Sequence, residues 1–143
     1  MCTCFKTAEY FLSLPDDDAG NAISNMKLQK LLYYAQGFAM ATLGKPLFAE
    51  DFEAWEYGPV LRAVYDKFKQ YGGSALPKPE DFSFSDYTEE EKDLLDEIYR
   101  VFGQYSAWAL SEMTHQTPPW RDAPRNGTIS KESMKAYFLT RIA

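Results

Sequence analysis

The sequence predicts a mainly α fold of the α+β kind. We expect a single domain of about six helices, with a short strand or β-hairpin between the second and third helices. Apolar residues recur at helical spacing in several segments, and most of these segments begin at capping residues. Alternation of apolar and polar residues is confined to one short stretch. The length of 143 residues suits one domain spanning 1–143.

The first two helices are predicted from apolar periodicity. Residues 4–14 carry apolar side chains at helical spacing. The second segment begins where Ser24 or Asn25 can act as the N-cap, and Gly44 can end it. Its apolar stripe consists of Leu28, Leu31, Leu32, Ala35, Phe38 and Ala39. We expect this second helix to be the central one.

The stretch FEAWEYGPV follows, and its alternation predicts a strand or hairpin. Gly58 can adopt backbone angles that other residues avoid, and Pro59 suits the first position of a helix. We therefore expect a turn at Gly58 and a helix that begins at Pro59. Trp55 and Tyr57 should pack near the start of the second helix.

Capping signals divide the C-terminal half into three further helices. Thr88 and Glu91 have the spacing of a capping box. A helix through AWALSEMTH follows, and Ser130 can cap the last helix. Between these two helices, the proline-rich segment QTPPWRDAPRNG is predicted to be a loop anchored by Trp120.

The charge distribution argues against a dedicated nucleic-acid-binding protein. The net charge is −6, whereas such proteins normally carry a basic surface. Residues 121–143 nevertheless hold five basic and two acidic side chains. A transcriptional regulator that contacts DNA through basic residues is therefore kept as the alternative function. No apolar run has transmembrane length and no signal-peptide pattern is present, so we expect a cytoplasmic location and no membrane partner.

No catalytic, metal or cofactor site is predicted. His115 is the one histidine, and Ser106 and Ser111 lie near it without the G-x-S-x-G turn of a nucleophile. A hydrolase built around His115 remains the weaker alternative. Cys2 and Cys4 with one histidine do not form a zinc-binding spacing, and no phosphate-binding loop is present. We expect the protein not to be an enzyme.

Lys27 and Lys30 lie one helical turn apart. We expect both to be exposed, where they could bind an acidic partner or a phosphate backbone. They could equally pair with the acidic residues of the 50–56 segment.

Several motifs together resemble the Panacea domain of the SocA-like antitoxin family, which is often found in phage-associated proteins. They are KLQKLLYYAQ, EAWEYGPV and THQTPPW, within residues 26–68 and 105–120 and followed by a short C-terminal helix. The resemblance implies a binding module of a toxin–antitoxin system that neutralises a co-encoded toxin by direct contact. For one SocA-type member it implies an adaptor that delivers the toxin to a Clp-type protease. Function does not follow from fold alone, so this step rests on the resemblance.

The resemblance also indicates which side chains belong to the family motifs. Gly58 and Pro59 are expected to serve backbone conformation. The candidate partner-binding residues are Lys27, Lys30, Tyr34, Trp55, Tyr57, His115 and Trp120. Each of these could either pack in the core or contact the toxin. We expect the contact surface to lie near Lys27, Lys30, Trp55 and Tyr57.

Overall fold

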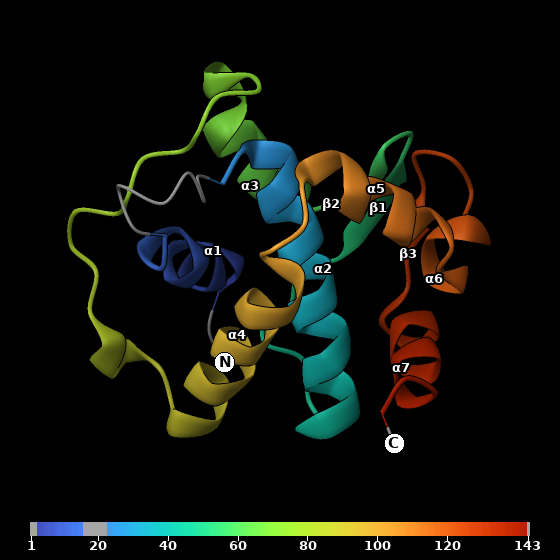
Figure 1. Cartoon of the computed structure of the whole chain (residues 1–143). Helices are drawn as coiled ribbons and strands as arrows, with labels where there is room; N and C mark the ends of the chain where they lie inside the picture. Colours follow the sequence, from blue (N-terminus) through green and yellow to red (C-terminus); the bar gives the residue numbers. More distant parts are fainter. Residues whose placement is uncertain (1–2, 16–22, 143) are drawn as a thin grey trace.

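Helix α2 (Asn25–Thr42) is the element around which the other elements are arranged. The computed structural model of the protein describes residues 3–15 and 23–142. Figure 1 shows α2 in the middle of the molecule, with α1 and α4 on one side of it and α7 on the other. The helices in contact with α2 are α1 (Cys4–Ser13), α3 (Arg62–Phe68), α4 (Glu89–Phe102), α5 (Ala107–His115) and α7 (Lys131–Leu139). The central position predicted for this helix is confirmed.

The ends of α2 form as the sequence predicts. The Ser24 side chain accepts a hydrogen bond from the Lys27 backbone N–H at 3.2 Å, which caps the helix. After the helix, Gly44 has a φ of 77°, a left-handed conformation that favours glycine. Burial is wider than the predicted stripe, because polar side chains of α2 are also buried. This all-round burial follows from helices packing on several sides of α2.

A small antiparallel sheet lies beside the helices. Strands β1 (Phe52–Trp55) and β2 (Gly58–Val60) form the predicted hairpin, and β3 (Thr128–Ile129) pairs with the other edge of β1. Phe52 and Ala54 face the core, while Glu53 and Trp55 are half-buried on the opposite face. Strand β3 was not predicted, because two residues are too few to show any periodicity.

The joint after the hairpin differs from the prediction. Gly58 has a φ of 119°, so its need for glycine is confirmed. Pro59, however, pairs with Ala54 inside β2, and α3 begins at Arg62. The prediction of a helix beginning at Pro59 was wrong. The chain stays extended because Gly58–Val60 pair with β1, and the backbone N–H of Leu61 then donates to the buried Gln29 side chain just before α3.

The C-terminal helices begin at the predicted caps. Thr88 and Glu91 form both hydrogen bonds of the capping box on α4. Ser130 caps α7 by accepting from the Ser133 backbone N–H. The proline-rich segment contains a short helix, α6 (Pro118–Arg121), where a loop was predicted. Two further single turns of 3-10 helix cover Lys69–Tyr71 and Phe84–Asp86.

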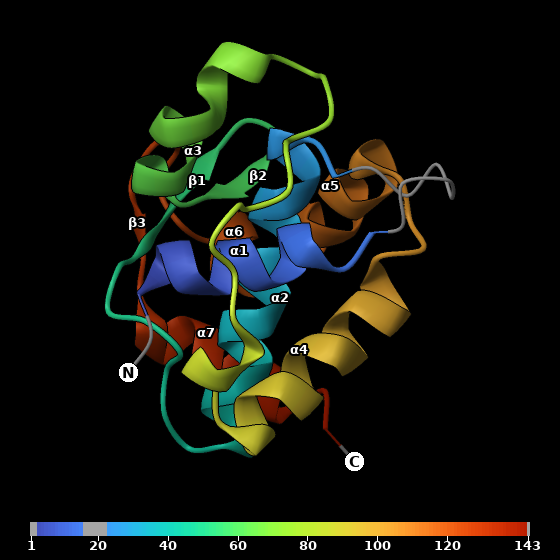
Figure 2. The ribbon, with the colours of Figure 1, turned by 90° about the vertical axis from the view of Figure 1, so that its left-hand side faces the viewer.

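The mainly α fold with a small β element is therefore confirmed. In Figure 2, α1 lies between α3 and α4 and contacts both. Aromatic side chains fill much of the core; Phe138 of α7, for example, packs edge-on against Tyr33 and Tyr34 of α2. Across residues 3–15 and 23–142, no helix has both the length and the apolar character needed to cross a bilayer.

Candidate functional site

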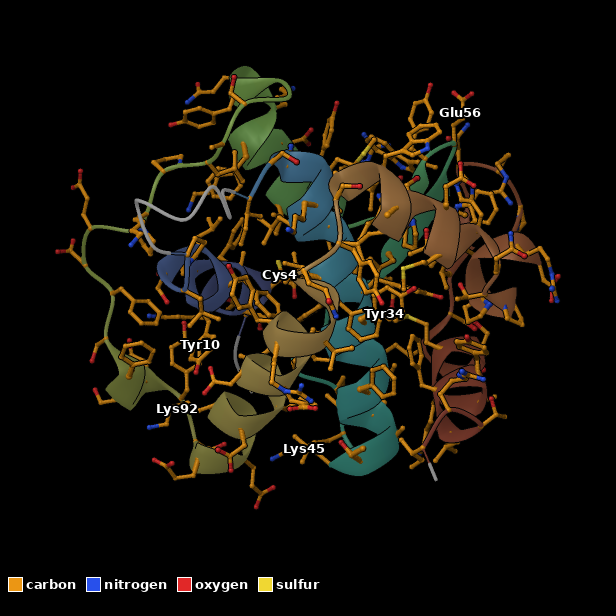
Figure 3. The ribbon with its side chains drawn as sticks, in the orientation of Figure 1. Cys4, Tyr10, Tyr34, Lys45, Glu56 and Lys92 are labelled. Atoms are coloured by element: carbon orange, nitrogen blue, oxygen red, sulfur yellow. The ribbon has the colours of Figure 1, made fainter. Side chains whose placement is uncertain are left out.

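A cleft of about 510 Å³ lies between the start of α2, the β1–β2 hairpin and the end of α3. Its lining comes from segments far apart in the sequence. Its lining includes Gln29, Lys30, Trp55, Glu56, Tyr57 and Tyr65. Trp55 and Tyr57 thus stand beside the start of α2, as predicted. Figure 3 shows Glu56 at the outer end of the hairpin.

Buried amides of α2 hold the wall of this cleft. Gln29 is 1% exposed; its Oε1 accepts from the Leu61 N–H at 2.8 Å, and its Nε2 donates to Asn25 Oδ1 at 2.9 Å. Asn25 Nδ2 in turn donates to the Tyr65 carbonyl at 3.2 Å. Buried backbone groups left without partners would cost about 1–3 kcal/mol each. These side chains therefore fix where β2 ends and α3 begins.

Lys30 is buried at the same joint, contrary to the expected exposure. It is 1% exposed, and its Nζ donates to the Pro59 carbonyl at 3.2 Å. Lys30 forms no ion pair with any carboxylate in the described part of the chain. Loss of hydration on burial lowers its pKa to about 7, and no neighbouring charge opposes this shift.

Gly58 is required at this joint for two independent reasons. Its φ of 119° is strained for other residues. A Cβ at this position would also lie 2.7 Å from Thr114 Oγ1 and 2.8 Å from Lys30 Cε. The preceding carbonyl of Tyr57 accepts from Ser111 Oγ at 2.5 Å. Lys30 of α2 and Ser111 of α5 thus both donate hydrogen bonds to backbone carbonyls of the hairpin.

Lys27 is also buried, so its expected exposure was wrong too. Its Nζ donates to the Gly103 carbonyl at 2.6 Å, just beyond α4, and burial lowers its pKa. Tyr34 is buried as well; its ring stacks on Phe102 with centroids 4.1 Å apart, and burial raises its pKa. Lys27 and Tyr34 fasten α4 to α2, and neither is presented on the surface.

Trp55 is half-buried in a small charged network on the outer face of β1. Its Nε1 donates to Glu53 Oε1 at 2.9 Å, and Arg62 donates to both oxygens of Glu53 at 3.1 Å. The Arg62 guanidinium also lies over the Trp55 ring, 5.3 Å from its centroid. The hydrogen bonds from Arg62, and next the one from Trp55, lower the pKa of Glu53. The network orients the indole at the edge of the cleft.

The rings of His115 and Trp120, both candidate partner-binding residues, stack on each other. Their rings lie 4.1 Å apart and nearly parallel, and the Arg125 guanidinium covers the indole ring at 3.9 Å. Trp120 Nε1 donates to the Trp55 carbonyl at 2.8 Å, which ties α6 to the hairpin. The predicted anchoring role of Trp120 is confirmed by this bond. Nε2 of His115 is buried without a hydrogen-bond partner among the described residues.

Tyr57 is the one exposed member of the candidate set, with 49% of its surface accessible. Trp108, at 60% accessible, lies beside it on α5 with ring centroids 6.4 Å apart. Sequence reasoning missed Trp108, although a signal exists. Leu110 and Thr114 are buried on α5, and helical spacing turns Trp108 well away from both of them around the helix axis. We call these two rings the Tyr57–Trp108 pair.

No three His, Cys, Asp or Glu side chains among the described residues lie close enough to hold a metal ion. Cys4 is buried, and Cys2 lies outside the described residues. Burial, followed by the nearby Glu50, raises the pKa of the Cys4 thiol to about 12, so the thiol is protonated at neutral pH.

Comparison with known proteins places these features in a family. The model of the family described as "Antitoxin SocA-like, Panacea domain" matches residues 28–121. Antitoxin SocA of Caulobacter vibrioides (strain NA1000 / CB15N) is 50% identical over 50 residues, which cover 35% of this chain and 27% of that protein. The chain thus matches about a quarter of the length of that relative. No solved structure matches. The family match runs from within α2 through the hairpin, α3, α4 and α5 to the end of α6, and the chain belongs to the SocA-like Panacea-domain antitoxin family.

Proposed function

We propose that this protein is the antitoxin of a two-protein toxin–antitoxin pair and that it neutralises a co-encoded toxin by direct binding in the cytoplasm. Membership of the SocA-like family supports the antitoxin role. The observation that carries direct binding is the Tyr57–Trp108 pair, two large exposed rings on firmly held elements. Rigid exposed aromatic side chains are the commonest anchors of protein–protein interfaces.

The placement of the pair supports its use as a docking point. Tyr57 is held through its own carbonyl by Ser111 of α5, the same helix that carries Trp108. This bond fixes the backbone that carries Tyr57 relative to the helix that carries Trp108. Such preorganisation reduces the entropy that ordering costs on binding.

The contacts of His115 support binding rather than catalysis. Its ring is stacked against Trp120. The hydroxyl of Ser111 donates to the Tyr57 carbonyl, and Ser106 accepts from the Ala109 N–H as a helix cap. Neither serine is therefore hydrogen-bonded to the histidine, as a nucleophile and its base would be. We propose that the protein is not an enzyme.

The DNA-binding alternative is less well supported. Among the basic residues of 121–143, Arg121 pairs with Asp122 and Lys131 with Asp51. Arg125 covers the Trp120 ring and donates to the Trp120 carbonyl. These engagements leave fewer free cations for phosphate contacts than the sequence suggests.

Co-expression with the product of the adjacent open reading frame tests the proposal, scored by growth and by co-purification. We expect that product to be toxic alone, and to be neutralised and co-purified when this chain is present. Trp108→Ala should weaken the complex by about 2 kcal/mol, about thirtyfold in affinity. Leu139→Ala is the matched control, because Leu139 is similarly exposed but lies on α7.

Three results would count against the proposal. A harmless neighbouring product removes the antitoxin role, and rescue without any complex removes direct binding. Equal affinity of the Trp108→Ala and Leu139→Ala variants rejects the Tyr57–Trp108 pair as the docking point. Delivery to a Clp-type protease is a separate step, measured by the half-life of the toxin with this chain in cells that have or lack the protease. An adaptor shortens that half-life only when the protease is present.

A further inference from the structure

We propose that the cleft beside the β1–β2 hairpin binds an acidic side chain of the toxin, with the Lys30 ammonium as its counter-charge. This inference rests on the proposed function and deepens it. It assigns to the cleft a ligand chemistry, a carboxylate, and it names the residue that recognises this group.

Lys30 is a buried cation with one protein acceptor and no counter-charge among the described residues. A lysine ammonium has three N–H donors, and the one protein acceptor here is the Pro59 carbonyl, at 3.2 Å. A buried charge normally has a partner of opposite charge, because removing an ion from water costs several kcal/mol. Lys30 has none within the described ranges, and yet it lines an open cleft. A carboxylate entering the cleft would supply the missing acceptor and the missing charge.

The rest of the cleft suits a side chain attached to a polypeptide. Trp55 and Tyr65, with ring centroids 4.8 Å apart, provide an apolar wall for the methylene groups beside a carboxylate. Tyr57 lines the cleft and also belongs to the Tyr57–Trp108 pair. The cleft and the exposed rings are therefore parts of one continuous surface. A partner docked on the rings reaches the cleft without a second binding site.

The glycine at position 58 keeps this arrangement possible. A Cβ on Gly58 would lie 3.2 Å from Lys30 Nζ, as well as closer still to its Cε. Any side chain there would displace the ammonium or cover it. Because Gly58 has no Cβ, the Lys30 ammonium lies directly beside the Gly58 backbone.

Proton linkage gives the proposal a specific signature. In the free protein burial brings the pKa of Lys30 to about 7, so the amine is largely neutral above that pH. A bound carboxylate stabilises the ammonium and must raise this pKa. Binding therefore takes up a proton above pH 7, and affinity should fall by up to about tenfold per pH unit from there. The other titratable groups lining the cleft are Glu56, Tyr57, Tyr65 and Lys69. From α5, the uncharged hydroxyl of Thr114 lies beside Gly58, next to Lys30.

The first experiment uses the protein alone with a small probe. NMR of lysine side chains follows the titration of Lys30, which is identified by the signal lost in Lys30→Met. We expect 3-phenylpropionate to raise the Lys30 midpoint by about one pH unit or more, and 3-phenylpropionamide, its neutral analogue, to leave it unchanged. Lys69→Met is the control, because Lys69 lines the same cleft but is exposed and paired with Asp66. Equal effects of the two probes, or no effect of either, would overturn the proposal.

The second experiment uses the toxin complex. We expect wild-type affinity to fall between pH 7 and pH 8.5, and Lys30→Met to bind more weakly at pH 7 without this pH dependence. Substituting the acidic residues of the toxin one at a time to their amides should reveal one that is coupled to Lys30 in a double-mutant cycle. Absence of such coupling contradicts the assignment. Loss of binding on extending the toxin's C-terminus, with no coupled side chain, would identify the terminal carboxylate instead and overturn the side-chain proposal.

The two proposals can fail separately. If the neighbouring product does not bind the wild-type chain at all, the proposed antitoxin function fails, and the probe experiment still decides whether the cleft recognises carboxylates. If the toxin binds but Lys30→Met binds equally well at every pH, the antitoxin role stands and the role of the cleft is wrong.

Discussion

At the scale of single residues, the polar members of the KLQK motif are structural parts of the core. Lys27 donates a hydrogen bond to the Gly103 carbonyl, and Lys30 donates one to the Pro59 carbonyl. Gln29 accepts a hydrogen bond from the Leu61 N–H. Each of them satisfies a backbone group where a helix or strand ends. Packing and hydrogen bonding thus account for Lys27 and Gln29 without any partner, whereas Lys30 keeps donors and a charge that its one protein acceptor does not satisfy.

Gly58→Ala should be strongly destabilising. A positive φ at a residue with a side chain costs about 1–3 kcal/mol, and crowding against Thr114 and Lys30 adds a similar amount. We expect a total loss of about 2–6 kcal/mol in urea denaturation. Gly44→Ala is the control, since Gly44 has φ 77° but nothing within 4 Å of its added Cβ, and so reports the backbone term alone. Equal losses in the two variants would show that crowding at Gly58 contributes nothing.

Lys30 should give the stability of the protein a measurable dependence on pH. Its folded pKa, about 7, lies below the unfolded value of 10.5. Between these values the unfolded chain binds the extra proton, so the free energy of unfolding rises with pH from about 7 upward. Urea denaturation at pH 7, 8 and 9 measures this. The free energy of unfolding of wild type should rise by about 1.4 kcal/mol per pH unit through Lys30, and that of Lys30→Met should lack this contribution. Identical slopes for the two proteins would mean that Lys30 stays charged in the fold.

At the scale of elements, the helix caps decide where the helices begin. The capping box of α4 satisfies two backbone N–H groups, whereas the Ser130 hydroxyl accepts from one N–H at the start of α7. Three glutamates in the first turn of α4 also favour its N-terminus electrostatically. These are local interactions, and for this reason the sequence predicts them well.

Thr88→Ala should therefore lower stability by about 1 kcal/mol. Ser130→Ala should cost no more than this, because its cap lacks the reciprocal bond. Thermal denaturation of both variants beside wild type makes the comparison. A loss in Ser130→Ala clearly larger than in Thr88→Ala would contradict the value assigned to the capping box.

The hairpin is an element whose position depends on its neighbours. Gln29 and Lys30 hold it from α2, Ser111 from α5, and Trp120 binds the Trp55 carbonyl. Such contacts between distant segments leave no periodic trace in the sequence. The sequence placed the start of α3 at Pro59, because a proline at a strand-to-helix joint is compatible with either element. The contacts with α2 and with β1 decide that Pro59 belongs to the strand.

At the scale of the whole molecule, α7 completes the core although it lies outside the segment matched by the family model. Phe138 is fully buried, and its ring lies against Gly37, where an added Cβ would be 2.2 Å from it. Small residues at such positions allow helices to approach closely. Gly37 thus makes room for the Phe138 ring in the packing of α7 against α2.

Phe138→Ala should cost about 3–5 kcal/mol, since it leaves a cavity against α2. Leu139→Ala, at the next position but exposed, should change the free energy of unfolding by less than about 0.5 kcal/mol. Chemical denaturation of the two variants measures the difference. Similar losses for both would show that α7 does not pack as described.

The sequence by itself determined the fold class, the central helix, the hairpin, the main helix caps and the family. All of these depend on local spacing, capping chemistry or motifs that a linear chain displays directly. Only the tertiary structure decided which motif residues reach the surface. It buried Lys27, Lys30 and Tyr34, stacked His115 on Trp120, and left Tyr57 exposed beside Trp108. The physical reason is that burial depends on helices from distant parts of the chain. A lysine on α2 is covered because α4 or the hairpin packs over it, and no periodicity within α2 records that packing.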